Sequence, residues 1–238
     1  MMLLVDIGNT RCKWALGTAT CVHHTGAMVR NDAQDWIDHL PTASVAAVVA
    51  SSVAQPDALE ALREYARRRG VALYAAASAA RSGALVNGYA QPQSLGVDRW
   101  MACIAAQADT QGSVLIADAG TALTLDFIDA QAHHQGGLIT PGVAAMRGAL
   151  RRQTQLRPNG NDAAARWLSR DTHSAIAAGT LRSAISLLDS AVQNLAPARL
   201  LLTGGDAALL APHLAHDWQL RAHLVMEGLA LHAQREAG

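Results

Sequence analysis

The sequence has few aromatic residues and no excess of either charge. Its 238 residues include one Phe, three Tyr and five Trp, and 19 Lys and Arg balance 19 Asp and Glu. A nucleic-acid-binding domain normally carries a basic excess, so the neutral total gives no support for direct nucleic-acid binding, although a local patch can hide within it. Half of the residues are hydrophobic, mainly Ala, Leu and Val. This composition excludes disorder and predicts a core of closely packed small side chains.

Cysteines, export signals and long apolar runs are also scarce. The three cysteines include no C-x-x-C pair, which is typical of a reduced cytoplasmic protein rather than a disulfide framework or a zinc site. The N-terminus has no basic region and reaches a carboxylate at Asp6, so no signal peptide is predicted. No uncharged apolar run of about 20 residues occurs, so we expect no transmembrane helix and no membrane partner.

One short pattern occurs twice, about half a chain apart. Leu-Leu-Val-Asp-Ile-Gly-Asn-Thr at 3–10 returns as Leu-Ile-Ala-Asp-Ala-Gly-Thr at 115–121, and strand-like residues follow each copy. Each copy predicts a buried strand, a tight turn and a second strand, as in a β-hairpin. The repeat predicts two related α/β halves, 1–110 and 111–238, around one nucleotide cleft. Helices are predicted at 32–40, 55–70, 97–108, 141–153, 171–195 and 223–233.

The repeated turn has the chemistry of a phosphate site. Glycine leaves backbone N–H groups uncovered, and a concave run of such groups binds anions. Asn9 and Thr10 add donors, and Lys13 adds a positive charge. The carboxylates of Asp6 and Asp118 would repel phosphate, so they are useful there only if they hold a cation or a cation-bound water. The alternative is a pair of plain hairpins in which Asp and Gly serve turn geometry.

Further candidate sites lie between and after the two turns. Asp98 opens a predicted helix, where it either stabilises the positive helix N-terminus or acts as a general base for a substrate hydroxyl. Asn87-Gly88-Tyr89 could form a wall of the acceptor pocket. The glycines after Thr203 could lie against a purine ring or form a plain turn. Arg147, with Arg151 and Arg152, is expected mainly on a solvated face, with a phosphate contact as the alternative.

These motifs together resemble the type III pantothenate kinases, which belong to the acetate kinase, sugar kinase, Hsp70 and actin superfamily. The resemblance rests on matches that follow the family order along almost the whole chain: Asp6–Trp14, Ser51–Val53, Asn87–Tyr89, Leu95–Trp100, Asp118–Thr124, Gly136-Gly137, Pro141-Gly142 and Thr203–Gly205. The first turn alone marks only the superfamily. Its combination with Asn-Gly-Tyr and Leu-Gly-Val-Asp-Arg-Trp is specific.

The resemblance implies ribonuclease-H-like halves and ATP-dependent phosphorylation of pantothenate, the first step towards coenzyme A. It implies ATP with Mg²⁺, a monovalent cation (K⁺ or NH₄⁺) at Asp118, and a homodimer. The N-terminal half would carry the first phosphate motif and the acceptor site, and the C-terminal half the second phosphate motif and the adenosine-side turn. Asp98 would be the catalytic base. ATP would be bound by Asp6, Ile7, Gly8, Asn9, Thr10, Arg11, Cys12, Lys13 and Thr121. Pantothenate would be bound by Tyr89, Gly96, Val97, Asp98, Arg99 and Thr172.

The match at Thr172 is looser than the others. His173 stands where an acidic or small residue is expected, and whether Thr172 acts across the dimer interface stays open. Two other functions also stay open: a kinase of this fold with another small hydroxyl acceptor, and an ATP-binding regulatory protein similar to a transcriptional co-activator. The intact carboxylates at Asp6, Asp98 and Asp118 argue against a purely regulatory role.

Overall fold

The computed structural model describes residues 1–18, 21–29, 36–53, 56–109, 111–153 and 167–237. These residues form two compact units. The first comprises Met1–Gln111 together with Ala130–Gly136 and His223–Gly238, and the second comprises Gly112–Asp129 and Gly137–Ala222. Two segments from the C-terminal half of the sequence therefore pack with the N-terminal unit. The predicted boundary falls at Thr110, which lies outside the described residues.

The first unit contains a five-stranded mixed sheet in the order β3-β2-β1-β4-β5. The strands are β1 (Met2–Ile7), β2 (Arg11–Gly17), β3 (Val22–Val29), β4 (Ala47–Ser52) and β5 (Ala72–Ala75). β1 pairs antiparallel with β2, as the predicted hairpin requires, and parallel with β4. β1 is central and covered on both faces, which explains its unbroken run of buried residues from Leu3 to Ile7.

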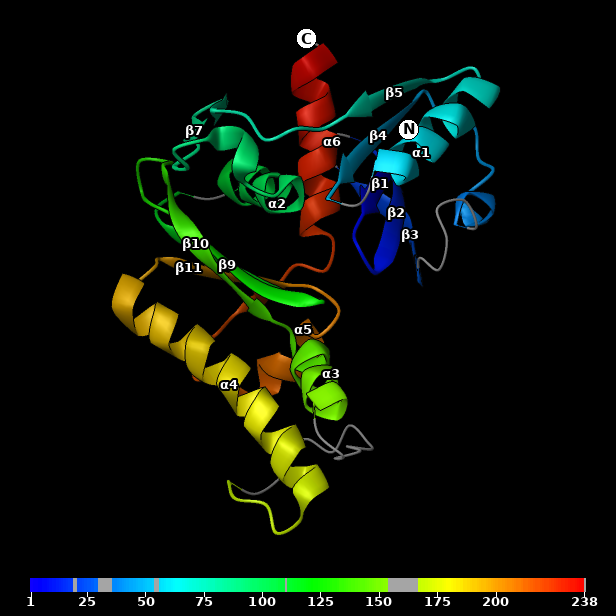
Figure 1. Ribbon diagram of the computed structural model, residues 1–238. Helices are drawn as coiled ribbons and strands as arrows, with labels where there is room; N and C mark the ends of the chain where they lie inside the picture. The colour runs from blue at the N-terminus through cyan, green and yellow to red at the C-terminus, as the bar shows by residue number, and fades with distance from the viewer. Residues whose placement is uncertain (19–20, 30–35, 54–55, 110, 154–166, 238) are drawn as a thin grey trace. The chain divides into compact units, whose positions relative to one another are not determined.

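Helices α1 (Pro56–Arg68), α2 (Val97–Ala108) and α6 (Leu224–Ala237) complete this unit. α2 and α6 lie side by side (Figure 1). A Cβ on Gly228 of α6 would lie 1.9 Å from the carbonyl oxygen of Met101 in α2, so only glycine permits this backbone approach. The contact fits the expected core of small side chains, because closely spaced helices leave room for little else.

The second unit repeats the same sheet. Its strand order is β10-β9-β8-β11-β12, which matches the first sheet strand for strand. The strands are β8 (Val114–Ala119), β9 (Ala122–Ile128), β10 (His134–Pro141), β11 (Arg199–Thr203) and β12 (Gln219–Leu220). β8 pairs antiparallel with β9 and parallel with β11. The predicted α/β fold class, with two related mixed sheets flanked by helices, is confirmed.

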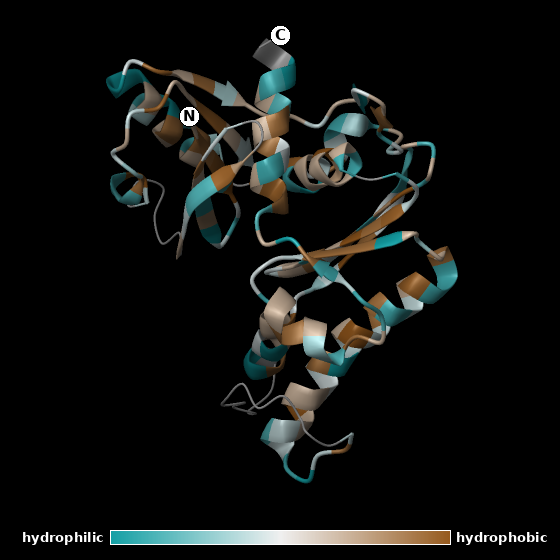
Figure 2. Cartoon of the chain, turned by 180° about the vertical axis from the view of Figure 1, so that it is seen from behind, coloured by the Kyte–Doolittle hydropathy of each residue, from teal (hydrophilic) through white to brown (hydrophobic). Residues whose placement is uncertain are grey.

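Helices α3 (Val143–Gln153), α4 (Thr172–Leu195) and the short α5 (Ala207–Leu210) belong to the second unit. α3 packs against α4 (Figure 1). Hydrophobic and hydrophilic residues alternate in bands along α4 (Figure 2), and residues such as Leu181, Ala184 and Leu188 are buried in the core of the unit. Of the described helices, α4 is the one whose length and composition would suit a membrane span. A core helix passes the same test, and α4 also carries Arg182 and Asp189.

The remaining elements are short: η1 (Ile37–His39), β6 (Arg81–Ser82), β7 (Leu85–Val86), η2 (Pro92–Ser94) and η3 (Ala211–His213). The helix predicted at 32–40 begins outside the described residues, and its described part forms only the single turn η1. The other predicted helices are present, with ends that differ by a few residues at most.

Candidate active site

The first repeated turn joins β1 to β2. Its carboxylate, Asp6, is buried at the end of β1 and accepts a 2.8 Å hydrogen bond at Oδ1 from the Ser51 hydroxyl of β4. The strand register places Asp6 between Ser51 and Lys13. The Gly8 N–H donates to the Arg11 carbonyl over 3.0 Å and closes the turn. The turn therefore exposes two polar residues, Asn9 and Thr10, close in the chain to the Asp6 carboxylate, whose orientation is fixed by Ser51.

Two of the residues predicted to bind ATP lie in the hydrophobic core. Ile7 and Cys12 are fully buried in the core of the first unit. They flank the turn as register partners on β1 and β2, and on these strands their side chains face the core. Any contact from either residue to a nucleotide would have to come from the main chain.

The second repeated turn joins β8 to β9 in the second unit. The Gly120 N–H donates to the Ala122 carbonyl over 2.9 Å and closes a turn one residue shorter than the turn that Gly8 closes. Thr121 is exposed at the tip. Gly142, just before α3, packs on this turn: its N–H donates to the Thr121 carbonyl, and a Cβ there would lie 2.1 Å from the Gly120 oxygen. The backbone of Gly142 therefore packs directly on the turn at Gly120 and Thr121, at a distance that only glycine allows.

The third glycine turn lies against the second. Gly204 follows β11 with φ of +97°, and a Cβ there would lie 2.5 Å from Oδ1 of Asp118 and 2.4 Å from the Ala119 carbonyl oxygen. The Asp206 N–H donates to that carbonyl over 2.8 Å. Asp118 is half-buried between two glycine-lined backbones. A carboxylate among main-chain groups is a donor set that suits a hard cation such as Mg²⁺ or K⁺.

Asn87 organises the loop at 87–89 of the first unit, called the acceptor loop here because it is predicted to contact the acceptor. Its buried side chain donates from Nδ2 to the carbonyls of Ala79 and Pro92, at 3.1 and 3.2 Å, and accepts from the Tyr89 N–H at 3.0 Å. The Tyr89 hydroxyl in turn accepts a 2.9 Å hydrogen bond from Nη1 of Arg99. Asn87 thus fixes the backbone that carries Tyr89, and Tyr89 meets a buried arginine.

The start of α2 gathers four of the predicted acceptor residues. Gly96 is the N-cap, and the helix begins with Val97, Asp98 and Arg99. Oδ1 of Asp98 accepts a 2.8 Å hydrogen bond from the Arg99 N–H and would lie 2.7 Å from a Cβ on Gly96. Glycine at 96 therefore leaves room for the carboxylate. Asp98 is half-buried, so a ligand can still reach it.

Thr172 lies in the second unit, exposed at the first residue of α4. Asp171 is the N-cap, and its Oδ1 accepts a 2.9 Å hydrogen bond from the Ser174 N–H. That hydrogen bond lowers the pKa of Asp171. The departure at His173 leaves this capping geometry intact, since the cap uses Asp171 and Ser174.

The structure thus groups the predicted residues in four places: the turn from Asp6 to Lys13, the start of α2 with Tyr89, the turn at Asp118 and Thr121, and the N-terminus of α4. Sequence reasoning missed the supporting contacts. Only the glycine pattern pointed to Gly142 and Gly204. Arg151 and Arg152 are exposed, as expected for a solvated face, whereas Arg147 is half-buried and its Nε donates to the Thr180 hydroxyl of α4 over 3.2 Å.

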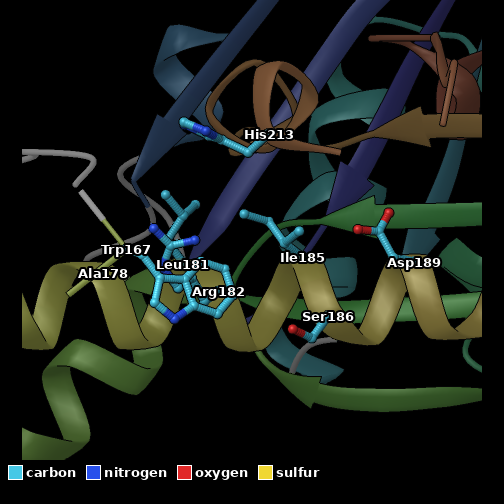
Figure 3. Close-up of a pocket in the computed structure, with 8 residues that line it drawn as sticks. All are labelled: Trp167, Ala178, Leu181, Arg182, Ile185, Ser186, Asp189 and His213. Carbon is cyan, nitrogen blue, oxygen red and sulfur yellow. The ribbon is translucent and has the colours of Figure 1, made fainter. Parts of the chain in front are cut away.

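A cavity of about 250 Å³ lies elsewhere in the second unit (Figure 3). The guanidinium of Arg182 stacks on the ring of Trp167, with 4.0 Å from its carbon to the ring centroid. Among the described residues that line this cavity, none belongs to the predicted site. They are Trp167, Ala178, Leu181, Arg182, Ile185, Ser186, Asp189 and His213.

Solved structures support the fold. A protein from Campylobacter jejuni described as a Baf family transcriptional activator superimposes with a TM-score of 0.66 at 22% identity, covering 99% of this chain and 98% of that one. A ROK family glucokinase from Streptomyces griseus, solved with glucose and AMPPNP, has a TM-score of 0.53 at 11% identity and covers 100% and 99%. At these identities the likeness establishes the fold alone.

Sequence comparison establishes the family. The model of the type III pantothenate kinases matches residues 2–194. A type III pantothenate kinase of Halorhodospira halophila is 36% identical, over 100% of this chain and 99% of the relative. One of Burkholderia mallei is 39% identical, over 97% and 98%. With its predicted motifs on matching strand ends and its full length aligned, this chain belongs to the type III pantothenate kinase family.

Proposed function

We propose that this protein transfers the γ-phosphate of ATP to the primary hydroxyl of pantothenate, giving 4'-phosphopantothenate in the first step of coenzyme A biosynthesis, in the cytoplasm. The observation that carries the proposal is family membership over the full length. The predicted acceptor residues support it, because Arg99 of α2 donates hydrogen bonds both to the Tyr89 hydroxyl and, through its main chain, to the Asp98 carboxylate.

The two repeated turns are the proposed phosphate sites. Gly8 and Gly120 each close a turn through a backbone hydrogen bond and leave polar tips exposed, at Asn9 and Thr10 in one turn and at Thr121 in the other. Backbone N–H groups bind phosphate without requiring a basic surface, which fits a chain of zero net charge. Lys13 supplies one cation beside the first turn.

The carboxylates of Asp6, which is buried, and Asp118, which is half-buried, fit the cations that such a reaction needs. Asp6 is held by Ser51, and Asp118 is bordered by Gly204 and the end of β11. When bound, Mg²⁺ and K⁺ or NH₄⁺ would offset the charge of the phosphate oxygens. Asp6 and Asp118 are the residues that would hold these ions, Asp118 the monovalent one, because each carboxylate stands beside one of the two repeated glycine turns.

Asp98 is the proposed general base at the acceptor site. The pantothenate hydroxyl oxygen forms a bond to the γ-phosphorus, the bond from that phosphorus to the bridging oxygen breaks, ADP leaves, and the hydroxyl proton passes to the Asp98 carboxylate. Arg99 would orient the pantothenate carboxylate, since a guanidinium donates to carboxylates in a fixed geometry. Tyr89 holds that guanidinium through its hydroxyl. Gly96 and Val97 complete the contact at the helix start.

We also propose that the protein acts as a homodimer. One face of α4 is exposed and carries small residues at helical spacing: Ala175, Gly179, Ser183, Ser186 and Ser190. Small residues let two helix backbones approach closely, so this face suits packing against a second copy. Thr172 lies at the end of the same face, which supports a contribution to acceptor binding across the interface.

The test is an ATP-dependent phosphorylation assay with pantothenate, with and without K⁺, on the full chain and on Asp98→Asn. Asp109→Asn is the matched control, because it makes the same chemical change at the other end of α2, on an exposed residue. We expect activity that depends on K⁺, its loss in Asp98→Asn, and its retention in Asp109→Asn. Turnover with another hydroxyl compound but not with pantothenate would favour the alternative acceptor. ATP binding without any turnover would favour the regulatory role.

A further inference from the structure

The acceptor loop rests on a segment that lies far from it in the sequence. Ala130–Gly136 belongs to the first compact unit, although the sequence repeat would place it in the second half, 111–238. The Val86 N–H donates to the Ala132 carbonyl over 2.9 Å, and Val86 forms a parallel bridge with His133. This segment therefore lies directly beside Asn87, Gly88 and Tyr89.

Gly88 brings the two backbones into direct contact. A Cβ at this position would lie 1.8 Å from the carbonyl oxygen of His134, a separation that no side chain can accept. The glycine in the Asn-Gly-Tyr motif thus has a specific partner, the main chain of His134. Asn87 anchors one side of this contact and the β-bridge anchors the other.

The side chain of His134 meets the side chain of Tyr89. His134 is 1% exposed, and its ring centroid lies 5.7 Å from that of Tyr89, with the ring planes 31° apart. Tyr89 also meets Arg99, through the 2.9 Å hydrogen bond to its hydroxyl and a guanidinium carbon 5.8 Å from the ring centroid. The Tyr89 ring thus has one aromatic partner and one cationic partner, both buried.

We propose that His134 is a positioning residue for acceptor binding: its buried ring sets the orientation of Tyr89, and Tyr89 sets that of Arg99. This inference rests on the proposed function, which assigns Tyr89 and Arg99 to pantothenate. A tyrosine ring without an aromatic neighbour rotates more freely about its side-chain torsions, and its hydroxyl then meets Arg99 for a smaller fraction of the time. Acceptor binding weakens, whereas ATP binding, served by the phosphate turns, does not.

Three variants separate this role from general packing. His134→Gln keeps a polar side chain and removes the ring, His134→Phe keeps a ring, and His133→Gln changes the exposed neighbour as a control. We expect His134→Gln to raise KM for pantothenate about tenfold, the effect of losing one buried aromatic contact. Its KM for ATP and its kcat stay near the parent values. His134→Phe restores most of the pantothenate affinity, and His133→Gln behaves as the parent.

A double-mutant cycle identifies the path of the effect. If His134 acts through Tyr89, His134→Gln has no further effect on KM for pantothenate in a Tyr89→Ala background. An undiminished effect in that background overturns the proposal. So does a rise in KM for ATP equal to the rise for pantothenate, because that pattern indicates general loss of structure.

A readout that needs no activity keeps the outcomes distinct. The chain has three tyrosines, so ring-labelled tyrosine gives three NMR signals, and Tyr89→Phe assigns one of them. We expect His134→Gln to shift and broaden the Tyr89 signal and to leave the other two in place. An unchanged Tyr89 signal overturns the inference. A parent enzyme that fails to phosphorylate pantothenate overturns the proposed function instead, and the NMR result then still decides whether His134 orients Tyr89.

Discussion

Gly142→Ala tests whether the second turn depends on the backbone contact behind it. The added Cβ would lie 2.1 Å from the Gly120 carbonyl oxygen and 2.9 Å from that of Thr121. Ordinary van der Waals contact begins near 3.4 Å, so the turn or the start of α3 must move by about 1 Å. Both neighbours are main-chain atoms, and neither can swing aside as a side chain would.

This displacement has two measurable consequences. Overpacking of this kind costs about 1–3 kcal/mol of unfolding free energy, which corresponds to a fall of roughly 2–12 °C in the unfolding temperature. A shift of about 1 Å in groups that position a substrate can cost about 100-fold in rate. We therefore expect kcat/KM for ATP to fall by about that factor if the turn at Gly120 and Thr121 binds its phosphates.

Gly148→Ala is the matched control on α3. A Cβ there would meet only the end of the flexible Arg152 side chain, at 3.4 Å. Alanine is favoured over glycine inside a helix, so this variant should gain about 0.5–1 kcal/mol of stability and keep its kinetics. Thermal unfolding and steady-state kinetics on both variants measure the stability and the kcat/KM for ATP that these predictions concern. Gly142→Ala with parental stability and parental kcat/KM for ATP would refute the reasoning.

The remaining predictions concern single hydrogen-bonded side chains. Ser51→Ala removes the donor to the buried Asp6 carboxylate, so we expect a loss of about 1–3 kcal/mol in denaturant unfolding and a higher KM for ATP. Asn87→Asp replaces a buried Nδ2 donor with an oxygen facing two carbonyls, and should cost at least about 2 kcal/mol and raise KM for pantothenate. Asp171→Ala should lower the unfolding temperature at neutral pH. The hydrogen bond from Ser174 holds the pKa of Asp171 below its ordinary 3.8, so this stabilisation is complete above that pH and disappears as the pH falls through the lowered pKa.

The repeat could be predicted from the sequence because the structure of each copy depends mainly on residues that are neighbours in the chain. Val5 and Ile116 lie in short apolar runs that end in Asp, a glycine turn and a hydroxyl residue, and such a pattern predicts a strand followed by a tight turn from neighbouring residues alone. The start of α2 follows in the same way from Gly96, which precedes an Ala-rich segment as its N-cap. Local patterns of this kind predicted the fold class and the position of both repeated glycine turns.

The contacts behind the site could not be predicted because they join distant residues. Gly142 meets Gly120 across 22 positions, and His134 meets Gly88 across 46. The sequence around Gly142 or His134 does not indicate which distant residue it contacts. A glycine after a proline is common in plain turns, and adjacent histidines are common on protein surfaces. The same limit applies to Ile7 and Cys12, whose burial follows from the pairing of β1 with β2 and β4 rather than from the motif itself.

Product analysis of one reaction tests the central claim most directly. The full chain is incubated with ATP, Mg²⁺, K⁺ and pantothenate, and mass spectrometry follows pantothenate, its phosphorylated product and ADP. The account predicts one 4'-phosphopantothenate for each ADP formed, and no phosphorylated product when Asp98→Asn replaces the parent. ADP formation without phosphorylated pantothenate, or full product formation by Asp98→Asn, would contradict it.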